Sequence, residues 1–514
     1  MTNPEAGAAQ RALASRLRAV APILLSELPE LVPAAAEDAA RVLTSIAGSL
    51  TADPANHRVW LTLAGISAAF PTRDDVDQVR RRLELSDPDE AAAFLLDFGL
   101  TAVQDSGAPL ATVQVVVGGV LVDVDFTSRH ELHTGIQRVV RQTVPIWNRD
   151  RDITAVAWTT ARGAFRPLDP DESARIFDWA DAPASSGQPL PAPDDNSRLV
   201  LIPWQSVVVL PEVPAVDVTP RIAAIGACSN NSVVAIGHDA IPLISAETLD
   251  IEEPRKFMSY LSALKFASCI AGVSRSSTRE FAGFGSMLSS QGLPAPRTIA
   301  ITLPAEFSRP DGPAAATQET PAANPPDVVV VGSHDTRKNH LAVLQAAEKL
   351  WREGLAFRLT FIGGGGSNLE FQRRIEVLMF HGRPVELRTA VSDQELKAAV
   401  STARFTVFPS LHEGYGLPVA ESMALGTPVI TTDYGATAEI AEGGGAVTVD
   451  PRDDAALTGA MRRLLTDDAE ITRLRAEIRR RAGRSWQSYA DELWNCVIGP
   501  ALDDVARTPF HEEH

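Results

Sequence analysis

The start of the chain repeats apolar side chains at helical spacing. Leu13, Leu17 and Val20 recur every three or four positions, and the same spacing returns over residues 91–100. This period places apolar residues along one face of a helix. We therefore expect residues 1–110 to form a helical extension that packs against the rest of the chain or self-associates into a homo-oligomer. Docking of a partner or acceptor is the alternative.

After residue 110 the pattern changes to short apolar runs that are typical of strands. The stretch 112–126 is rich in β-branched residues, and Gly118 and Gly119 within it suit a hairpin turn. Three further runs have the continuous apolar character of buried parallel strands: 199–204, 232–239 and 269–274. With helical sequence between them, these runs predict an α/β domain over 111–307.

A stretch rich in Pro and Ala, 308–326, interrupts the alternation and predicts an interdomain linker. A second α/β unit is expected over 327–484, again with helical sequence in each gap. Its expected strands are 327–332, 358–364, 384–388, 404–410, 427–433 and 446–450. This order predicts a complete doubly wound sheet. The amphipathic stretch 485–498 predicts a last helix within a C-terminal segment, 485–514.

The motif HEGYGLPVAESMALGTPV, residues 412–429, connects two of these strands. Gly414 and Gly416 allow the backbone to approach a ligand closely, and Pro418 suits the first turn of the helix that follows. The unpaired amides near Leu417 would favour an anion at the start of this helix.

Two carboxylates flank this turn. Glu413 precedes it, and Glu421 lies one turn into the helix, so each could hold one end of an elongated ligand such as a sugar nucleotide. The alternative is that both acids merely occupy a helix start, where the helix dipole favours negative charge.

Two cations follow the first strand of the second unit. Arg337 and Lys338 lie near the start of a helix within residues 330–350. A bidentate Arg and a point-charge Lys beside helix-start amides would offset the charge of a diphosphate. A solvated helix start is the alternative.

Together, these motifs resemble the donor-binding signature of the retaining glycosyltransferases of family four, the group 1 type. The resemblance implies the α/β GT-B fold, two facing Rossmann-like domains, and covers roughly residues 120–500. It implies that Arg337 and Lys338 hold the donor's diphosphate, Glu413 the sugar near the reacting centre, and Glu421 the ribose. It also implies that the last helix crosses back onto the N-terminal domain.

The resemblance extends to donor contacts elsewhere. His238 and Asp239 end a predicted strand and would face the donor sugar from the N-terminal domain, although a His in that position is more often structural on composition alone. Gly135 lies in a loop that would approach the donor phosphates. Arg138 follows it, either as a donor contact or as a salt-bridged helix residue. The donor-binding backbone would run from Gly414 through Tyr415 and Gly416 to Leu417.

One departure and two weaker signals qualify the pattern. Many relatives place an Arg directly after the turn glycine, where this chain has Ser333 and His334. The glycines of 362–366 suit a backbone turn better than a phosphate site. Asp123 and Asp125 spell a metal-binding Asp-x-Asp, but they alternate along a predicted strand without a third ligand. We therefore expect no metal. We also expect no cofactor, because no dinucleotide-binding fingerprint is present.

Composition and charge limit the class of protein and its expected location in the cell. The 514 residues carry a net charge of −18, which argues against a general nucleic-acid binder. No apolar run approaches the roughly 20 residues that span a bilayer, and the N-terminus does not resemble a signal peptide. We expect a cytoplasmic protein, with a peripheral position at the inner membrane face as the alternative. Cys228, Cys269 and Cys496 are expected to be reduced and mostly buried.

The resemblance implies a retaining glycosyltransferase that moves a hexose or deoxyhexose from a nucleoside diphosphate sugar to an acceptor hydroxyl. The acceptor would be a saccharide or a lipid-linked molecule, in surface polysaccharide or glycoconjugate synthesis. A sugar phosphorylase or sugar-phosphate synthase of the same fold, and a non-catalytic GT-B scaffold, are the alternatives.

Overall fold

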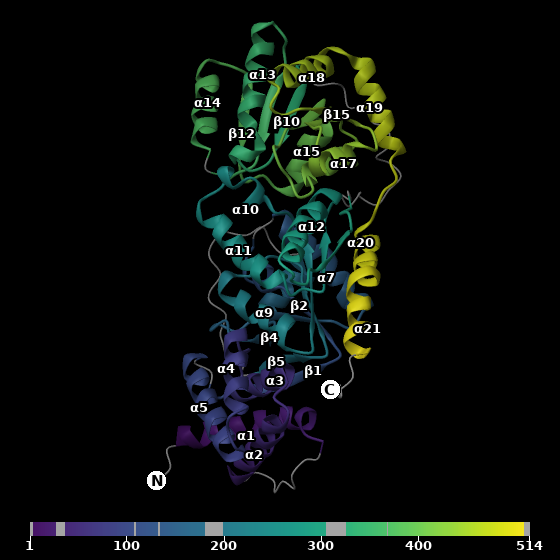
Figure 1. Cartoon of the computed structure of the whole chain (residues 1–514). Coiled ribbons are helices and arrows are strands. Elements are labelled where there is room, and N and C mark those ends of the chain that lie inside the picture. The colour runs from purple at the N-terminus through teal and green to yellow at the C-terminus, as the bar shows by residue number, and fades with distance from the viewer. Residues whose placement is uncertain are drawn as a thin grey trace.

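A computed structural model describes residues 4–26, 36–106, 109–131, 134–179, 199–304, 325–366 and 368–507. Figure 1 shows three blocks stacked along one axis: a helical block at the N-terminal end, a helix-covered sheet in the middle and a second helix-covered sheet at the far end. Residues 308–324 of the expected linker lie outside the described residues. The expected fold class, two facing Rossmann-like units with an N-terminal helical extension, is confirmed.

The N-terminal block consists of helices, as their apolar spacing predicts. Its core is formed by buried side chains such as Leu17, Val20 and Trp60. Arg16 ties the block to the sheet, because its guanidinium donates to the carbonyl oxygens of Ile66 (3.1 Å) and Ala111 (3.0 Å). The helices are α1 (Pro4–Leu24), α2 (Ala36–Ala52), α3 (Asn56–Ser67), α4 (Arg73–Leu83) and α5 (Pro88–Ser106).

The middle sheet has nine strands in the order β1-β5-β4-β3-β2-β6-β7-β8-β9, and β4 is antiparallel to both its neighbours. The strands are β1 (Thr112–Val117), β2 (Val120–Asp123), β3 (Thr154–Trp158), β4 (Phe165–Pro167), β5 (Leu199–Trp204), β6 (Val207–Leu210), β7 (Ser232–Gly237), β8 (Cys269–Gly272) and β9 (Arg297–Ala300). The helices are α6 (Asp125–Arg129), α7 (Gly135–Asp150), α8 (Pro170–Phe177), α9 (Thr219–Cys228), α10 (Ile241–Ile244), α11 (Glu252–Leu264) and α12 (Arg275–Ser290), with 3-10 turns at Val216–Val218 and Ala246–Thr248.

The expected hairpin at Gly118 and Gly119 is wrong. β1 pairs in parallel with β5, whereas β2 pairs in parallel with β3 and β6. The amide of Gly118 donates to the carbonyl of Trp204 (3.0 Å), and the amide of Val207 donates to the carbonyl of Gly119 (2.9 Å). The glycines therefore carry the chain from the sheet edge to its centre without reversing its direction. The left-handed φ of Gly118, 67°, serves this crossing.

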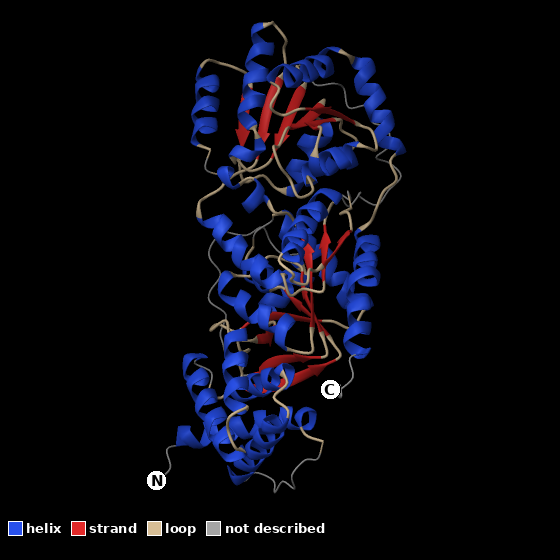
Figure 2. Ribbon diagram, in the orientation of Figure 1, coloured by secondary structure: helices blue, strands red, loops and turns tan. Residues whose placement is uncertain are grey.

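The second sheet has six strands, all parallel, in the order β12-β11-β10-β13-β14-β15. All six strands expected from the apolar runs are present: β10 (Asp327–Val331), β11 (Arg358–Ile362), β12 (Val385–Arg388), β13 (Phe405–Phe408), β14 (Val429–Thr432) and β15 (Ala446–Val449). Helices cover both faces, as Figure 2 shows. They are α13 (His340–Arg352), α14 (Leu369–Phe380), α15 (Asp393–Thr402), α16 (Leu417–Ala424), α17 (Gly435–Ala441), α18 (Asp454–Thr466) and α19 (Asp468–Arg480), with a 3-10 turn at Thr336–Lys338.

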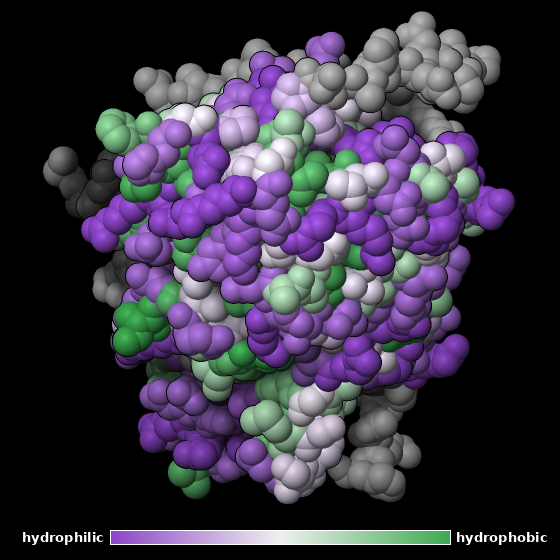
Figure 3. All heavy atoms as spheres, turned by 90° about the horizontal axis from the view of Figure 1, so that it is seen from above, coloured by the Kyte–Doolittle hydropathy of each residue, from purple (hydrophilic) through white to green (hydrophobic). Residues whose placement is uncertain are grey.

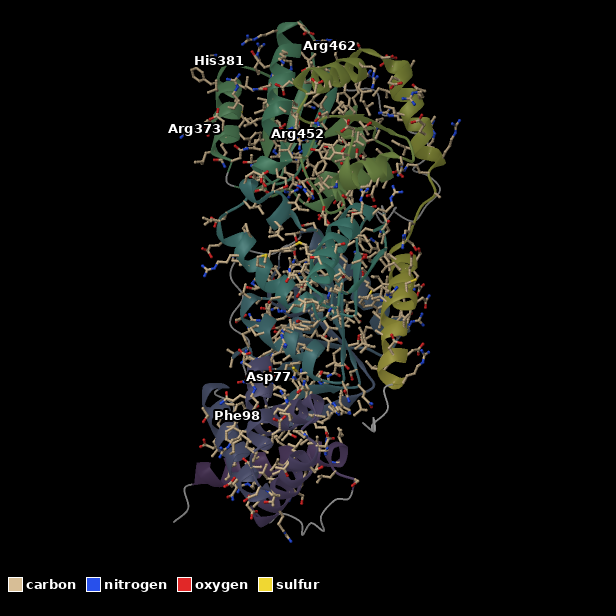
Figure 4. All side chains as sticks on the ribbon, in the orientation of Figure 1. Asp77, Phe98, Arg373, His381, Arg452 and Arg462 are labelled. Atoms are coloured by element: carbon tan, nitrogen blue, oxygen red, sulfur yellow. The ribbon has the colours of Figure 1, made fainter. Side chains whose placement is uncertain are left out.

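The end of the chain returns to the middle block, as expected. It forms α20 (Trp486–Leu493), a π-helical turn (Trp494–Ile498) and α21 (Gly499–Arg507), which run along the middle block in Figure 1. Trp147 Nε1 of α7 donates to the carbonyl of Ala490 (3.0 Å), which fixes the return. One continuous apolar core includes residues of α7, α16 and α20, and side chains of both blocks reach into the junction between the two sheets (Figure 4).

The surface matches a globular chain. Viewed onto the second sheet's end of the molecule, it is mainly hydrophilic with small separate hydrophobic patches (Figure 3). No helix in the described ranges has the length and apolar character that crossing a bilayer requires. Cys228 and Cys269 are buried, Cys496 is half-buried, and all three are free thiols, as expected.

Candidate functional site

The carboxyl ends of β10 and β13 meet where the strand order of the second sheet reverses. Ligands of open α/β sheets bind in the crevice at such a point. The turn after β10 carries Arg337 and Lys338, and the loop after β13 carries Glu413. Lys338 Nζ and Arg337 Nη1 each lie 2.7 Å from Oε1 of Glu413. The fold thus brings two of the predicted cations and one predicted carboxylate into one cluster.

Glu413 is the centre of this cluster. Ser410 Oγ donates to the same Oε1 (2.6 Å), whereas Oε2 accepts no hydrogen bond from the described residues. Burial alone would raise the pKa of Glu413, but the charges of Lys338 and Arg337 outweigh it and hold that pKa below its ordinary value. The result is an ionised carboxylate with one saturated oxygen and one that can accept from a ligand hydroxyl.

The glycine turn after Glu413 is where the two halves touch. A Cβ on Gly414 would lie 2.2 Å from the carbonyl oxygen of His238, so only glycine fits. Gly416 has a φ of 108° and precedes Leu417, the first residue of α16, with Pro418 in its first turn as predicted. No side chain caps α16. Pro418 has no amide hydrogen and the amide of Val419 donates to the carbonyl of Gly416 (3.0 Å), so the amide of Leu417 is the one that can meet an anion at the start of the helix.

His238 and Asp239 follow β7 and line the same junction. His238 Nε2 donates to the carbonyl of Pro211 (2.8 Å), and burial lowers the pKa of His238 to about 4, so its ring is neutral near pH 7. Asp239 accepts from the amide of Ile241 (3.1 Å), and burial raises its pKa to about 6. The predicted N-terminal pair therefore lies directly against the Gly414 turn.

Glu421, the residue expected to hold a ribose, meets Arg138 from the other half. The guanidinium of Arg138 in α7 forms an ion pair with Glu421 in α16. A Cβ on Gly135, the first residue of α7, would lie 3.3 Å from Cδ1 of Leu417. The first turn of α7 thus packs on the first turn of α16. Of the two alternatives for Arg138, the structure shows the salt-bridged helix residue.

The side chain of Tyr415 points away from Glu413. Its hydroxyl donates to the carbonyl of Leu303 in the middle block (2.7 Å), and burial raises the pKa of Tyr415 to about 12. It lines a cavity of about 290 Å³ together with Arg275 and Arg481. The ring of Tyr415 therefore joins the two halves, and only its backbone belongs to the glycine turn.

A second contact between the halves, which the sequence did not predict, is made by His412, the residue just before Glu413. His412 Nε2 lies 2.8 Å from Oε1 of Glu280 in α12, and His412 Nδ1 lies 3.1 Å from Oγ of Ser245. The hydrogen bond to Glu280 raises the pKa of His412 above its ordinary value. Ser274, the N-cap of α12, also donates to the carbonyl of Gly414 (2.6 Å). The available signal was the position of His412 inside the glycine motif.

The Asp-x-Asp has its oxygens taken up by protein donors. Asp123 ends β2 and Asp125 begins α6, so they do not alternate along one strand as expected. Trp158 Nε1 donates to Asp123 (2.8 Å), while Asp125 pairs with Arg129 (2.8 Å) and Arg162. Within the described ranges, no group of three or more His, Cys, Asp or Glu residues could hold a metal ion.

The glycine run after β11 has a backbone role. A Cβ on Gly363 would lie 2.1 Å from the carbonyl oxygen of Gly332, and one on Gly366 would lie 2.4 Å from the carbonyl carbon of His334. Both glycines have positive φ. The loops after β10 and β11 thus pack backbone to backbone, which accounts for the run without a phosphate.

Residues 325–467 match the family model described as "Glycosyl transferases group 1". This segment is a group 1 glycosyltransferase domain. The group 1 domain contains the whole six-stranded sheet and four charged residues of the site: Arg337, Lys338, Glu413 and Glu421.

Two curated relatives are named mannosyltransferases. The MMP alpha-(1->4)-mannosyltransferase of Mycolicibacterium hassiacum is 41% identical over 110 residues, which are 21% of this chain and 27% of that protein. The serotype-specific mannosyltransferase WbdA of Escherichia coli is 26% identical over 340 residues, which are 63% of this chain and 40% of that protein. The chain thus spans well under half the length of these relatives. Among solved structures, sucrose-phosphate synthase from Thermosynechococcus elongatus aligns with a TM-score of 0.48 at 16% identity, covering 74% of this chain and 98% of that chain.

Proposed function

We propose that this protein is a retaining glycosyltransferase that moves a hexose or deoxyhexose from a nucleoside diphosphate sugar to an acceptor hydroxyl. One observation carries the proposal: Arg337, Lys338 and Glu413 cluster at the switch point of the group 1 domain, beside the uncapped start of α16. Cations and the free amide of Leu417 suit a diphosphate, and an ionised carboxylate beside them suits the hydroxyls of a sugar.

The chemistry follows from where charge develops. Breaking the bond to the anomeric carbon leaves negative charge on the departing diphosphate. Arg337, Lys338 and the amide of Leu417 at the start of α16 are fixed donors for that charge, so they would lower the barrier without reorganising. The reaction as proposed needs no metal and no cofactor.

The remaining residues are proposed to position the donor. The free Oε2 of Glu413 would accept from a sugar hydroxyl, Glu421 would hold the ribose, and His238 with Asp239 would face the sugar from the other half. His238 is neutral near pH 7 and its Nε2–H donates to the carbonyl of Pro211, so its Nδ1 can accept one hydrogen bond from a sugar hydroxyl. Retention would result from attack on the same face as the leaving group, with the departing phosphate accepting the acceptor's proton.

We propose mannose as the first sugar to test, because two relatives are named mannosyltransferases. The acceptor is proposed to be a saccharide or a lipid-linked molecule in surface polysaccharide or glycoconjugate synthesis.

The test is incubation of the full chain with a panel of nucleoside diphosphate sugars and candidate acceptors, with detection of released nucleoside diphosphate. The anomeric configuration of the product, read by NMR, checks retention. Release that depends on an acceptor hydroxyl is the expected result. Phosphate or a sugar phosphate as the preferred acceptor would instead indicate a phosphorylase or a sugar-phosphate synthase. Failure to bind any nucleoside diphosphate would contradict the proposal.

A further inference from the structure

The charges of the site are divided unequally between the two halves. The group 1 domain supplies two cations and two carboxylates: Arg337, Lys338, Glu413 and Glu421. The cluster at Glu413 has two cations for one carboxylate, whereas Glu421 has no cation from its own half among the described ion pairs. Its partner is Arg138, which reaches it across the junction from α7.

The position of Arg138 is built by two close contacts. Gly135 begins α7 and packs against Leu417 at the first residue of α16. Arg138 follows in the first turn of α7, and its side chain is 26% exposed, compared with 13% for Glu421. The guanidinium therefore lies at the carboxylate of Glu421, one turn from the start of α16.

The Glu421 carboxylate and the Arg138 guanidinium can each bind a ligand group as well as each other. Glu421 is expected to accept hydrogen bonds from ribose hydroxyls, and a guanidinium is a fork of donors that matches phosphate oxygens. In a nucleoside diphosphate the ribose and the α-phosphate are adjacent. One such ligand could therefore satisfy both Glu421 and Arg138 when it enters between them.

We propose that Arg138 is a further donor-binding residue, whose guanidinium exchanges the Glu421 carboxylate for the diphosphate of the sugar nucleotide. This inference rests on the proposed function. It assigns to the N-terminal half a third cation for the diphosphate, beside Arg337 and Lys338. Because Arg138 lies on α7, its contact with the diphosphate would also couple donor binding to the packing of the two halves against each other.

The competing interpretation is that Arg138 acts only on Glu421, as a clasp between the halves. The two interpretations predict different results in a double-mutant cycle. A direct contact with the diphosphate persists when the charge of Glu421 is removed, whereas an effect through Glu421 disappears.

The experiment is calorimetric titration of the full chain with GDP, UDP and ADP, to find the diphosphate that the wild type binds. That diphosphate is then titrated into Arg138→Ala, Arg138→Lys, Glu421→Gln and the double variant Arg138→Ala/Glu421→Gln. Arg149→Ala is the matched control, because Arg149 lies in the last turn of the same helix, where it pairs with Asp150. If Arg138→Ala does not fold, as checked by thermal unfolding, Arg138→Gln takes its place and keeps a hydrogen-bond donor.

We expect Arg138→Ala to weaken binding about tenfold or more in both the wild-type and the Glu421→Gln background. Arg138→Lys should recover part of the loss, and Arg149→Ala should bind like the wild type. Unchanged or tighter binding in Arg138→Ala, or an effect that vanishes in the Glu421→Gln background, would overturn the inference while leaving the proposed function intact. A wild type that binds none of the three diphosphates would overturn both.

Discussion

The two halves of the site differ in how they treat charge. In the group 1 domain, Lys338 and Arg337 keep Glu413 ionised despite its burial. In the middle block, burial dominates: the pKa of His238 falls to about 4, and that of Asp239 rises to about 6. One half thus offers two cations to an anionic ligand, and the other presents a neutral His238 beside a carboxylate that is mostly ionised near pH 7. The comparison implies that substitutions should act on different steps in the two halves.

The largest effect should follow from removing the charge of Glu413. Glu413→Gln keeps the side-chain volume and the hydrogen bond from Ser410, so we expect the fold to be retained. Turnover should fall by about a hundredfold or more, about 2.7 kcal/mol in barrier height, because the carboxylate that is proposed to position the sugar is lost. Initial rates at saturating donor measure it, with Glu386→Gln, an exposed residue of β12, as the control. Wild-type turnover in Glu413→Gln would remove Glu413 from the reaction.

A smaller effect, on binding instead of turnover, is expected at Lys338. Lys338→Ala removes a point charge that is proposed to face the diphosphate, so donor affinity should fall about tenfold. Titration with the nucleoside diphosphate that the wild type binds measures this change. Lys349→Ala, at an exposed position near the end of α13, the helix that follows Lys338, is the control. Equal affinities for the two variants would show that Lys338 serves only to neutralise Glu413.

The same contrast explains how much the sequence could predict. All six strands of the group 1 domain follow from apolar runs, because each strand–helix unit of a doubly wound sheet packs beside an earlier one. The cluster of Arg337, Lys338 and Glu413 was predictable for the same reason: these residues follow strands that end at one sheet edge. Local patterns were sufficient there.

Local patterns were insufficient where distant segments decide the structure. Gly118 and Gly119 are typical of a hairpin turn, but β1 and β2 do not pair with each other. β1 pairs with β5 and β2 pairs with β6, and both partners lie far along the chain. The contacts of Arg138 with Glu421 and of His412 with Glu280 join the two halves, and no spacing within either segment encodes how the halves face each other.

The contact between His412 and Glu280 gives a pH test of the comparison, with a smaller expected effect. The hydrogen bond to Glu280 raises the pKa of folded His412, so its stabilising contribution is complete below the unfolded pKa of about 6.5. The contribution is lost as the pH rises through the higher folded pKa. At about pH 6, the melting temperature of the wild type should therefore exceed that of Glu280→Gln by less than about 4 °C. This difference should be smaller at about pH 8.5.

The measurement is thermal unfolding of both proteins across this pH range. Glu376→Gln on the outer face of α14 is the control, because it removes an exposed carboxylate far from His412. A difference between wild type and Glu280→Gln that stays constant with pH would mean that His412 does not titrate in this contact.

The smallest expected effect is that of a chelator, which should leave the rate unchanged. The reason lies in the middle block: Asp123 accepts from Trp158 Nε1, and Asp125 is paired with Arg129 and Arg162. A cation would have to displace these donors, and the two arginines would repel it. Initial rates with and without EDTA, after dialysis, measure the effect. Loss of activity that Mg²⁺ or Mn²⁺ restores would require the ion pairs of Asp125 to open, and the middle block would then supply metal ligands as well as its packed contacts.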